Sequence, residues 1–195
     1  MTFKATIQKI LILIAVLSIL PLSGCTTLNS QTLDLHPEIQ VSRQFSKEKR
    51  FDIQPKDLRV NKVIGLRHTG KDPQPEIVLQ DSLKLLSHTA EHALEDMGIR
   101  RFYAGEFTLK ISLLDLNYKV KKSGLKQTID LDMKMRVELS KGTKSYTGNY
   151  ATTKQHVFLN TPSEQDNEEI IGKLVSETMN RAFNDPQLLD FIQFN

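Results

Sequence analysis

Residues 128–139 alternate so regularly between apolar and polar side chains that they define one element of the fold. One face of this segment would carry only apolar side chains, namely Ile129, Leu131, Met133, Met135, Val137 and Leu139. The other face would carry Thr128, Asp130, Asp132, Lys134, Arg136 and Glu138. Because successive side chains of a strand point to opposite faces, this pattern predicts a strand with one buried and one wet face. Such strands are typical of an antiparallel sheet that is covered on a single side.

Three further strands are predicted around this one. Apolar residues alternate along 107–113, and the phase then slips to continue through 114–118, which indicates a β-bulge. A turn containing glycine leads from the central strand into another strand over 146–157. Upstream, a strand is predicted over 58–66 and ends at the glycine and proline residues of 70–75. The apolar residues expected to share its face are Leu58, Val60, Ile64 and Leu66.

Apolar residues at helical spacing predict two main helices and a short one. The first helix is expected over 76–97, with Gly98 as its C-terminal cap. Its apolar stripe is Leu79, Leu83, Leu86, Ala90, Ala93, Leu94 and Met97. The second helix is capped by Ser163. Its stripe is Ile170, Ile171, Leu174, Val175, Thr178, Met179, Ala182 and Phe183. Asp185 and Pro186 then begin a short C-terminal helix.

The order of these elements is strand, helix, three strands, helix and short helix. It predicts an α+β fold: an antiparallel sheet of about four strands with the two main helices packed on one face. We expect a single α+β domain over residues 58–195.

The N-terminus predicts a lipoprotein signal peptide over residues 1–24. Lys4 and Lys9 precede an apolar stretch at 10–22, which would form a helix of roughly 20 Å, too short for a hydrocarbon core of about 30 Å. Gly24 and Cys25 follow, and Cys25 is the only cysteine of the chain.

That arrangement resembles the lipobox of bacterial lipoproteins, in which the chain is cleaved before the cysteine. The resemblance implies diacylglycerol and an N-acyl chain on Cys25, cleavage between Gly24 and Cys25, and no other cofactor. In such lipoproteins an aspartate after the cysteine retains the protein at the inner membrane. Here Thr26 and Thr27 follow, which predicts the outer membrane with the domain facing the periplasm.

Residues 25–57 are mostly polar and are expected to form the lipidated cysteine and a tether. Within them, Leu33, Leu35, Ile39 and Val41 alternate loosely and predict an irregular edge strand. The charge run 47–50 is interpreted as a solvated loop, with contact to membrane lipids as the alternative.

Charge argues against nucleic acid as a partner. The whole chain carries a formal charge of +3, and the loss of Lys4 and Lys9 with the signal peptide leaves about +1. Nucleic-acid binding needs a clustered excess of positive charge.

The layout also resembles the YajG-type family of bacterial envelope lipoproteins. The similarity is carried by the segment 80–99, by the strand around Tyr146 and Tyr150, and by the ending 185–192. It implies an accessory or scaffold module of the cell envelope that binds another envelope protein. The resemblance also leads us to expect an acidic residue near Arg67, which is flanked in the sequence by Leu66 and His68.

One enzymatic motif occurs, since residues 88–92 read H-x-x-E-H, the zinc signature of inverzincin metalloproteases. Glu168 or Glu169 is the candidate third ligand. However, His88 and His92 each lie about 200° around the helix from a core residue, so both are expected to point to solvent. A zinc site needs converging ligands and a dry wall around them, and we therefore predict no metal and no catalysis.

Two other pairs could form a site. Asp130 and Asp132 share a strand face at a spacing that glycosidase carboxylates can show, but they alternate with cations and are expected to form salt bridges across the sheet. Tyr146 and Tyr150 share one face of a strand with a glycine between them, and they fit either the core or a shallow binding surface. Tyr146, Tyr150 and Arg67 are the candidate binding surface. A carrier of small ligands or lipid is the alternative function, and a metal-dependent envelope hydrolase is the rival class.

Overall fold

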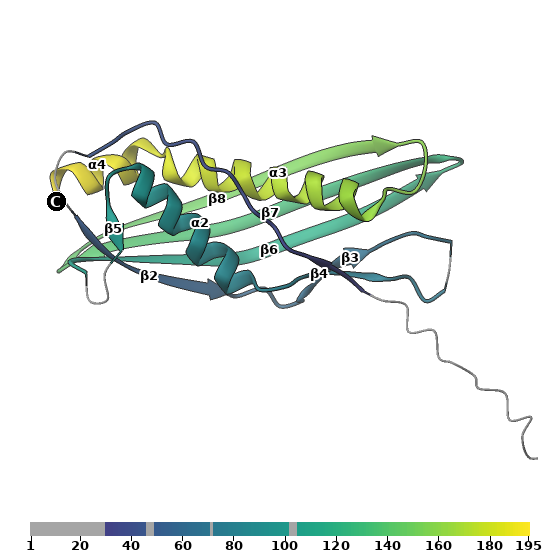
Figure 1. Ribbon diagram of the computed structural model, residues 1–195, viewed down its shortest axis with the longest axis horizontal. Coiled ribbons are helices and arrows are strands. Elements are labelled where there is room, and N and C mark those ends of the chain that lie inside the picture. Colours follow the sequence, from purple (N-terminus) through teal and green to yellow (C-terminus); the bar gives the residue numbers. More distant parts are fainter. Residues whose placement is uncertain (1–29, 46–48, 71, 102–104) are drawn as a thin grey trace, which may run out of the picture.

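Within the part of the chain that the computed structural model describes, residues 30–45, 49–70, 72–101 and 105–195, eight strands form one mixed sheet (Figure 1). These strands are β1 (Gln31–Leu33), β2 (Arg50–Asp57), β3 (Val63–Leu66), β4 (Glu76–Leu79), β5 (Arg100–Arg101), β6 (Phe107–Ser123), β7 (Lys126–Lys141) and β8 (Lys144–Phe158). The hydrogen-bonded order is β1-β4-β3-β6-β2-β5, with β7 on the other edge of β6 and β8 beyond β7.

The long antiparallel meander β6–β7–β8 confirms the strands predicted over 107–157. All six apolar side chains of the alternating segment in β7 are buried, each at most 1% exposed. In β6 the pairing with β7 shifts between Leu113 and Asp115, so Leu114 is the residue of the predicted bulge. The bulge lets the strand bury Leu113 and Leu116 on the same side despite their odd spacing.

The prediction of an antiparallel sheet of about four strands is wrong in number and in direction. Strand β2 runs parallel to β6 with Phe51 opposite Phe107, and β1 runs parallel to β4. The rings of Phe51 and Phe107 stack at 4.7 Å between their centroids. Parallel neighbours are distant in sequence because a crossover must connect them, so no local hairpin pattern announces β2.

The three helices of the described residues are α2 (Ser82–Asp96), α3 (Glu164–Phe183) and α4 (Pro186–Phe194). Helix α2 packs on β2 and β5, whereas α3 packs on β7 and β8, so both main helices cover the same face of the sheet (Figure 1). The predicted N-terminal caps are confirmed for α3 and α4, at Ser163 and Asp185. Every residue of the predicted α3 stripe is buried.

Two predicted boundaries are corrected by the structure. The helix expected from residue 76 begins only at Ser82, because residues 76–79 form β4 and Asp81 caps the helix. The strand expected over 58–66 shrinks to β3. Of its four expected inward residues, only Ile64 is buried, whereas Leu58, Val60 and Leu66 are exposed.

The expected tether also belongs largely to the domain. From Gln31 to Phe45, odd-numbered side chains face inward and even-numbered ones outward, as in an extended chain laid on a surface. The edge strand expected around 33–41 is found as β1, which ends at Leu33. Residues 50–57 form β2, and Lys49 is buried over the Phe107 ring, so this end of the charge run is not a solvated loop. The signal peptide, Gly24 and Cys25 lie outside the described residues, as do residues 47 and 48.

Candidate functional site: a groove beside helix α2

An extended segment, residues 34–45, runs along α3 and is held there by side chains of the helix (Figure 1). Asn180 accepts a hydrogen bond from the N–H of Gln40 (2.8 Å) and donates through Nδ2 to the carbonyl of Glu38 (3.1 Å). Asn184 accepts from the N–H of Ser42 (2.6 Å) and donates to the carbonyl of Gln40 (2.8 Å).

The spacing of these contacts follows from helix and strand geometry. Four helical residues advance about 6 Å, and two extended residues advance about 6.6 Å, so one polar residue per helical turn meets every second residue of the segment. The two asparagine amides thus act as the neighbouring strand that the segment lacks. Ser176, Asn180 and Asn184 at four-residue spacing were the available sequence signal for this arrangement.

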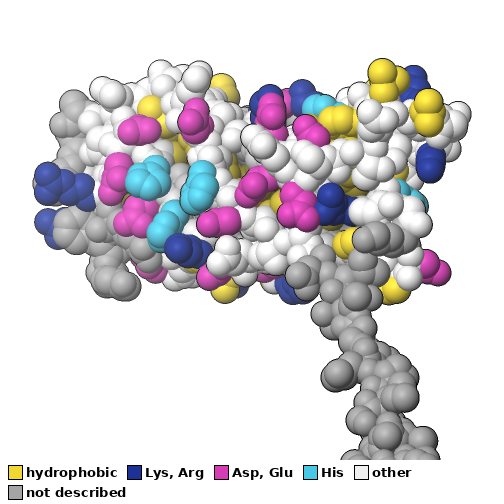
Figure 2. Space-filling view, turned by 45° about the vertical axis from the view of Figure 1, so that its right-hand side comes forward, with side chains coloured by type: hydrophobic (Ala, Val, Ile, Leu, Met, Phe, Trp, Pro, Cys, Tyr) yellow, Lys and Arg dark blue, Asp and Glu magenta, His cyan; other side chains and the backbone are white. Residues whose placement is uncertain are grey.

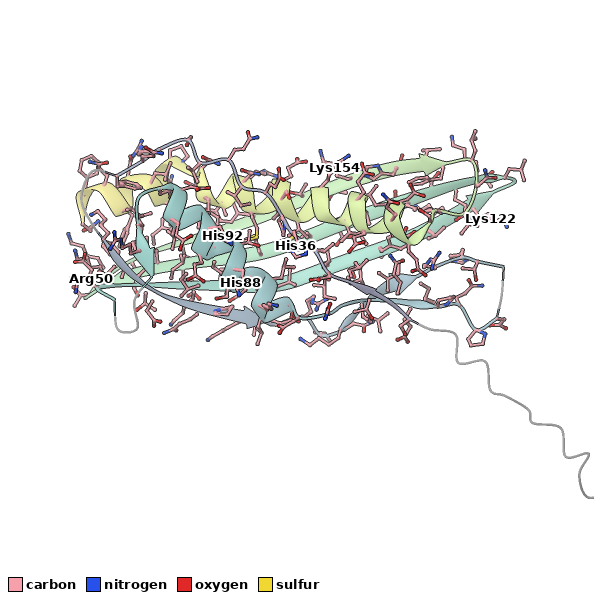
Figure 3. All side chains as sticks on the ribbon, in the orientation of Figure 1. His36, Arg50, His88, His92, Lys122 and Lys154 are labelled. Atoms are coloured by element: carbon pink, nitrogen blue, oxygen red, sulfur yellow. The ribbon has the colours of Figure 1, made fainter. Side chains whose placement is uncertain are left out.

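A groove of about 690 Å³ lies between the beginning of this segment and α2. Its apolar lining comes from four leucines, Leu33, Leu35, Leu79 and Leu85. Three histidines also line it, His36 from the extended segment and His88 and His92 from α2. Figure 2 shows histidine side chains gathered with carboxylates on one face of the molecule, and Figure 3 shows these three close together beside α2.

The histidines are exposed, as predicted for His88 and His92. Nδ1 of His92 lies 3.5 Å from Oε2 of Glu95, and Nε2 of His36 lies 3.7 Å from Oδ2 of Asp34. Among the described residues no three His, Cys, Asp or Glu side chains are placed to hold a metal ion. The nominated third zinc ligands, Glu168 and Glu169, line a separate depression between the extended segment and α3.

The groove therefore offers imidazoles and carboxylates for hydrogen bonds and charge pairing above an apolar base. Its one hydroxyl, that of Thr89, donates to the backbone carbonyl of Leu85 (2.7 Å) and so remains bonded within α2. This chemistry suits the binding of a polar surface rather than bond cleavage.

The structure places Tyr146 and Tyr150 where β8 meets α4. Their hydroxyls lie 2.8 Å apart, and each donates to Oδ2 of Asp185 at 2.9 Å. A Cβ added at Gly148 would lie 2.3 Å from the hydroxyl oxygen of Tyr150, so glycine is required between the two rings. Tyr150 is 8% exposed, which favours the core interpretation of this pair over a binding surface.

The same aspartate caps α4, so this cluster joins the sheet to the C-terminal helix. Burial raises the pKa of Tyr150, and its bonds to Tyr146 and Asp185 raise it further. Burial also acts to raise the pKa of Asp185, but bonds from the two tyrosines and from the α4 backbone outweigh it and lower this pKa.

Arg67 is not brought together with the tyrosines. It lies at the other end of α3, where its guanidinium pairs with Glu164 at 2.5 Å. The acidic partner expected near Arg67 thus comes from the first turn of α3 rather than from its own strand. Its buried Nε has no hydrogen-bond partner among the described residues.

Asp130 and Asp132 take part in contacts across the outer face of the sheet. Asp130 pairs with Lys121 (2.7 Å), as predicted for a wet face, and Asp132 accepts from Nδ2 of Asn117 (2.8 Å). These contacts leave the two carboxylates as parts of the sheet surface.

A buried charge cluster at the end of β2 was missed by the sequence interpretation. Asp57 accepts from Nε (3.0 Å) and Nη2 (2.8 Å) of Arg59 and from Oγ of Ser82 (2.6 Å), and Nζ of Lys62 lies 3.0 Å away. The side chains of Arg59 and Asp57 are 4% and 9% exposed. Burial acts to raise the pKa of Asp57, but the bonds from Arg59, Ser82 and Lys62 outweigh it and hold this pKa well below its usual range.

This cluster fixes the loop that follows β2 against the start of α2. Because Arg59 points inward, its neighbours Leu58 and Val60 point to solvent, and Leu58 is 53% exposed. A second depression, of about 660 Å³, lies beside Leu58 and Leu83. The end of α2 that borders the histidine groove thus also presents exposed apolar side chains.

Comparison with protein families decides what kind of protein this is. A family model described as "Uncharacterized lipoprotein" (Lipoprotein_16) matches residues 37–193, from the extended segment to the last turn of α4. The chain belongs to this lipoprotein family. The resemblance to YajG-type lipoproteins is thereby confirmed. No curated protein matches the sequence. In the described residues, no helix is both long and apolar enough to cross a membrane.

Solved structures share the fold at low sequence identity. Protein XCC0632 from Xanthomonas campestris is 10% identical, with a TM-score of 0.50 over 78% of this chain and 93% of that chain. A putative neuraminyllactose-binding hemagglutinin homolog from Helicobacter pylori is 9% identical, with a TM-score of 0.39 over 82% and 98%. Lipoprotein GNA1162 from Neisseria meningitidis is 15% identical, with a TM-score of 0.35 over 69% and 97%.

Proposed function

We propose that this lipoprotein is anchored in the outer membrane through acylated Cys25, with its domain in the periplasm, and serves as a non-catalytic binding module of the cell envelope. The match of the lipoprotein family over residues 37–193 is the observation that carries this proposal. The sequence supports it, because a short apolar segment ends at the single cysteine.

The histidine groove is the surface that we propose for the partner. Most of its polar lining is exposed, so a ligand in it would remain largely in contact with water. Pockets for small molecules instead bury most of the ligand surface. A carrier of lipid or small ligands would need an apolar cavity between sheet and helices, but the buried side chains there pack into one continuous cluster. The geometry therefore favours another envelope protein as the partner over a small ligand.

Site-specific crosslinking in intact envelopes tests this assignment. A photoreactive amino acid at position 88 lies in the groove, and one at position 134 lies on the exposed outer face of the sheet as the matched control. We expect a discrete adduct with one envelope protein from position 88 and none from position 134. The same adducts from both positions, or none from position 88, would contradict the groove as the binding surface.

A further inference from the structure

The turn between β6 and β7 concentrates positive charge at one end of the molecule. We call residues 119–126 the hairpin tip. It carries four lysines, an exposed leucine and the turn glycine, namely Lys119, Lys121, Lys122, Lys126, Leu125 and Gly124. All of these side chains are exposed, and Lys122 marks this end of the sheet in Figure 3. Asp130 is the nearest acidic residue along the chain, and it pairs with Lys121.

Exposed apolar side chains accompany these lysines. Leu125 is 83% exposed at the turn itself. The end of β8 lies beside β7 here, with Val157 opposite Thr128, and Val157 and Leu159 are 51% and 74% exposed. Lysines around exposed aliphatic side chains match the chemistry of a phospholipid surface, which presents anionic head groups above acyl chains.

The described chain begins at this same end. Nε2 of Gln31 donates to the carbonyl of Glu164 in the first turn of α3 (2.7 Å). Three residues earlier, Thr161 accepts a hydrogen bond from Nε2 of Gln127 in β7 (2.9 Å). Gln31 therefore lies level with the part of β7 that adjoins the hairpin tip, far from the C-terminus (Figure 1).

The sequence places Cys25 only six residues before Gln31. Six residues span at most about 20–22 Å when fully extended. Strand β7 alone, with 16 residues, is about 50 Å long. An acyl anchor on Cys25 thus keeps the hairpin-tip end near the membrane. The opposite end could reach the membrane only if the long axis of the domain lay flat on it.

We propose that the hairpin tip docks on the anionic phospholipid head groups of the membrane that holds the anchor. This inference rests on the proposed acylation of Cys25. The lysines supply attraction to the head groups and Leu125 enters the interface, so the tip is a second membrane contact beside the lipid. Charge alone would not choose this end, because Arg50 and Lys144 make the opposite end basic as well; the length of the link does.

The test uses the full chain, acylated in cells and reconstituted into vesicles of phosphatidylcholine mixed with phosphatidylglycerol. Because acylation blocks the single native thiol, Leu125→Cys provides one site for a fluorescent label. Thr143→Cys, in the exposed β7–β8 turn at the opposite end, is the matched control. A quencher attached to lipid head groups should quench the label at position 125 strongly and the label at 143 little. Equal quenching, or stronger quenching at 143, overturns the proposal.

Charge variants test the chemistry of the contact. Lys119→Gln, Lys122→Gln and Lys126→Gln together should lower the docking equilibrium about 100-fold, which corresponds to about 1 kcal/mol for each lysine near an anionic surface. The control set Lys56→Gln, Lys134→Gln and Lys144→Gln makes the same charge change at exposed positions elsewhere. It should leave quenching at position 125 unchanged, and equal effects of the two sets overturn the proposal.

Failure of the anchor and failure of the docking are distinguishable. A wild-type protein that does not float with the vesicles lacks the acyl anchor, which contradicts the proposed function. A protein that floats with them while the label at position 125 stays unquenched contradicts only the docking of the tip.

Discussion

Asp57→Asn is expected to be among the most damaging single-atom changes in the domain. The substitution keeps the size of the side chain but removes the negative charge that faces the buried guanidinium of Arg59. Breaking a buried ion pair on one side costs about 3–5 kcal/mol, because the remaining charge is left unpaired away from water. A domain of this size loses about 2–4 °C of melting temperature for each kcal/mol.

The matched control is Asp190→Asn. Asp190 also accepts from an arginine, Arg43, at 2.8 Å, but these side chains are 54% and 38% exposed. Exposed pairs contribute about 0–1 kcal/mol, so the control should lose at most that amount. Urea unfolding followed by circular dichroism suits a soluble form that begins near residue 30, since the chain has no tryptophan. Equal losses in the two variants would refute the argument from burial.

The pH dependence supplies a second check on the same residue. The pKa of Asp57 is lowered in the folded state, so the stability it contributes is present above its unfolded pKa of about 3.9 and is lost as pH falls through the folded value. The difference in unfolding free energy between wild type and Asp57→Asn should therefore be constant from neutral pH to about pH 5 and shrink in stronger acid. A difference that grows in acid would contradict the depressed pKa.

Three further predictions concern the core and the two sets of candidate site residues. Leu131→Ala should cost about 2–5 kcal/mol of unfolding free energy, whereas its neighbour Asp132→Ala, on the outer face of the sheet, should cost under about 1 kcal/mol; similar losses in urea unfolding would mean that the faces are misassigned. Tyr150→Phe removes a hydrogen bond to a carboxylate and should cost about 1.5–3 kcal/mol in the same assay, and an unchanged midpoint would argue against a structural role. Replacing His88 and His92 together by glutamine should change stability by no more than about 0.5 kcal/mol. Stoichiometric zinc in untagged protein, lost in that double variant, would overturn the prediction that no metal is bound.

Elements with local sequence signals were predictable. The alternation that ends at Leu139, the bulge at Leu114 and the cap at Ser163 each depend on neighbours within a few residues, and all three are found where expected. Strand β4 was assigned to a helix because a short apolar run fits both periods. The signal that separates the two is the capping aspartate Asp81, which follows that run.

Elements whose partners are distant in sequence were not predictable. Strand β2 offers only Phe51 and Ile53 as buried apolar residues, and its partner β6 is reached only after a crossover. Likewise the exposure of His88 follows from the helical period, but the approach of His36 to it depends on how the extended segment lies on α3. Arg59 next to Asp57 reads as surface charge until the fold buries both.

The fate of Cys25→Ser in cells tests the central claim, attachment through a lipid, most directly. Electrophoresis and mass spectrometry of envelope fractions would follow the wild-type protein and the variant. We predict that the wild type begins at acylated Cys25 and fractionates with the outer membrane. The variant should accumulate as a full-length precursor whose signal peptide is not removed. Release of a soluble, correctly processed domain from Cys25→Ser, or a wild-type protein without acyl chains, would contradict the account.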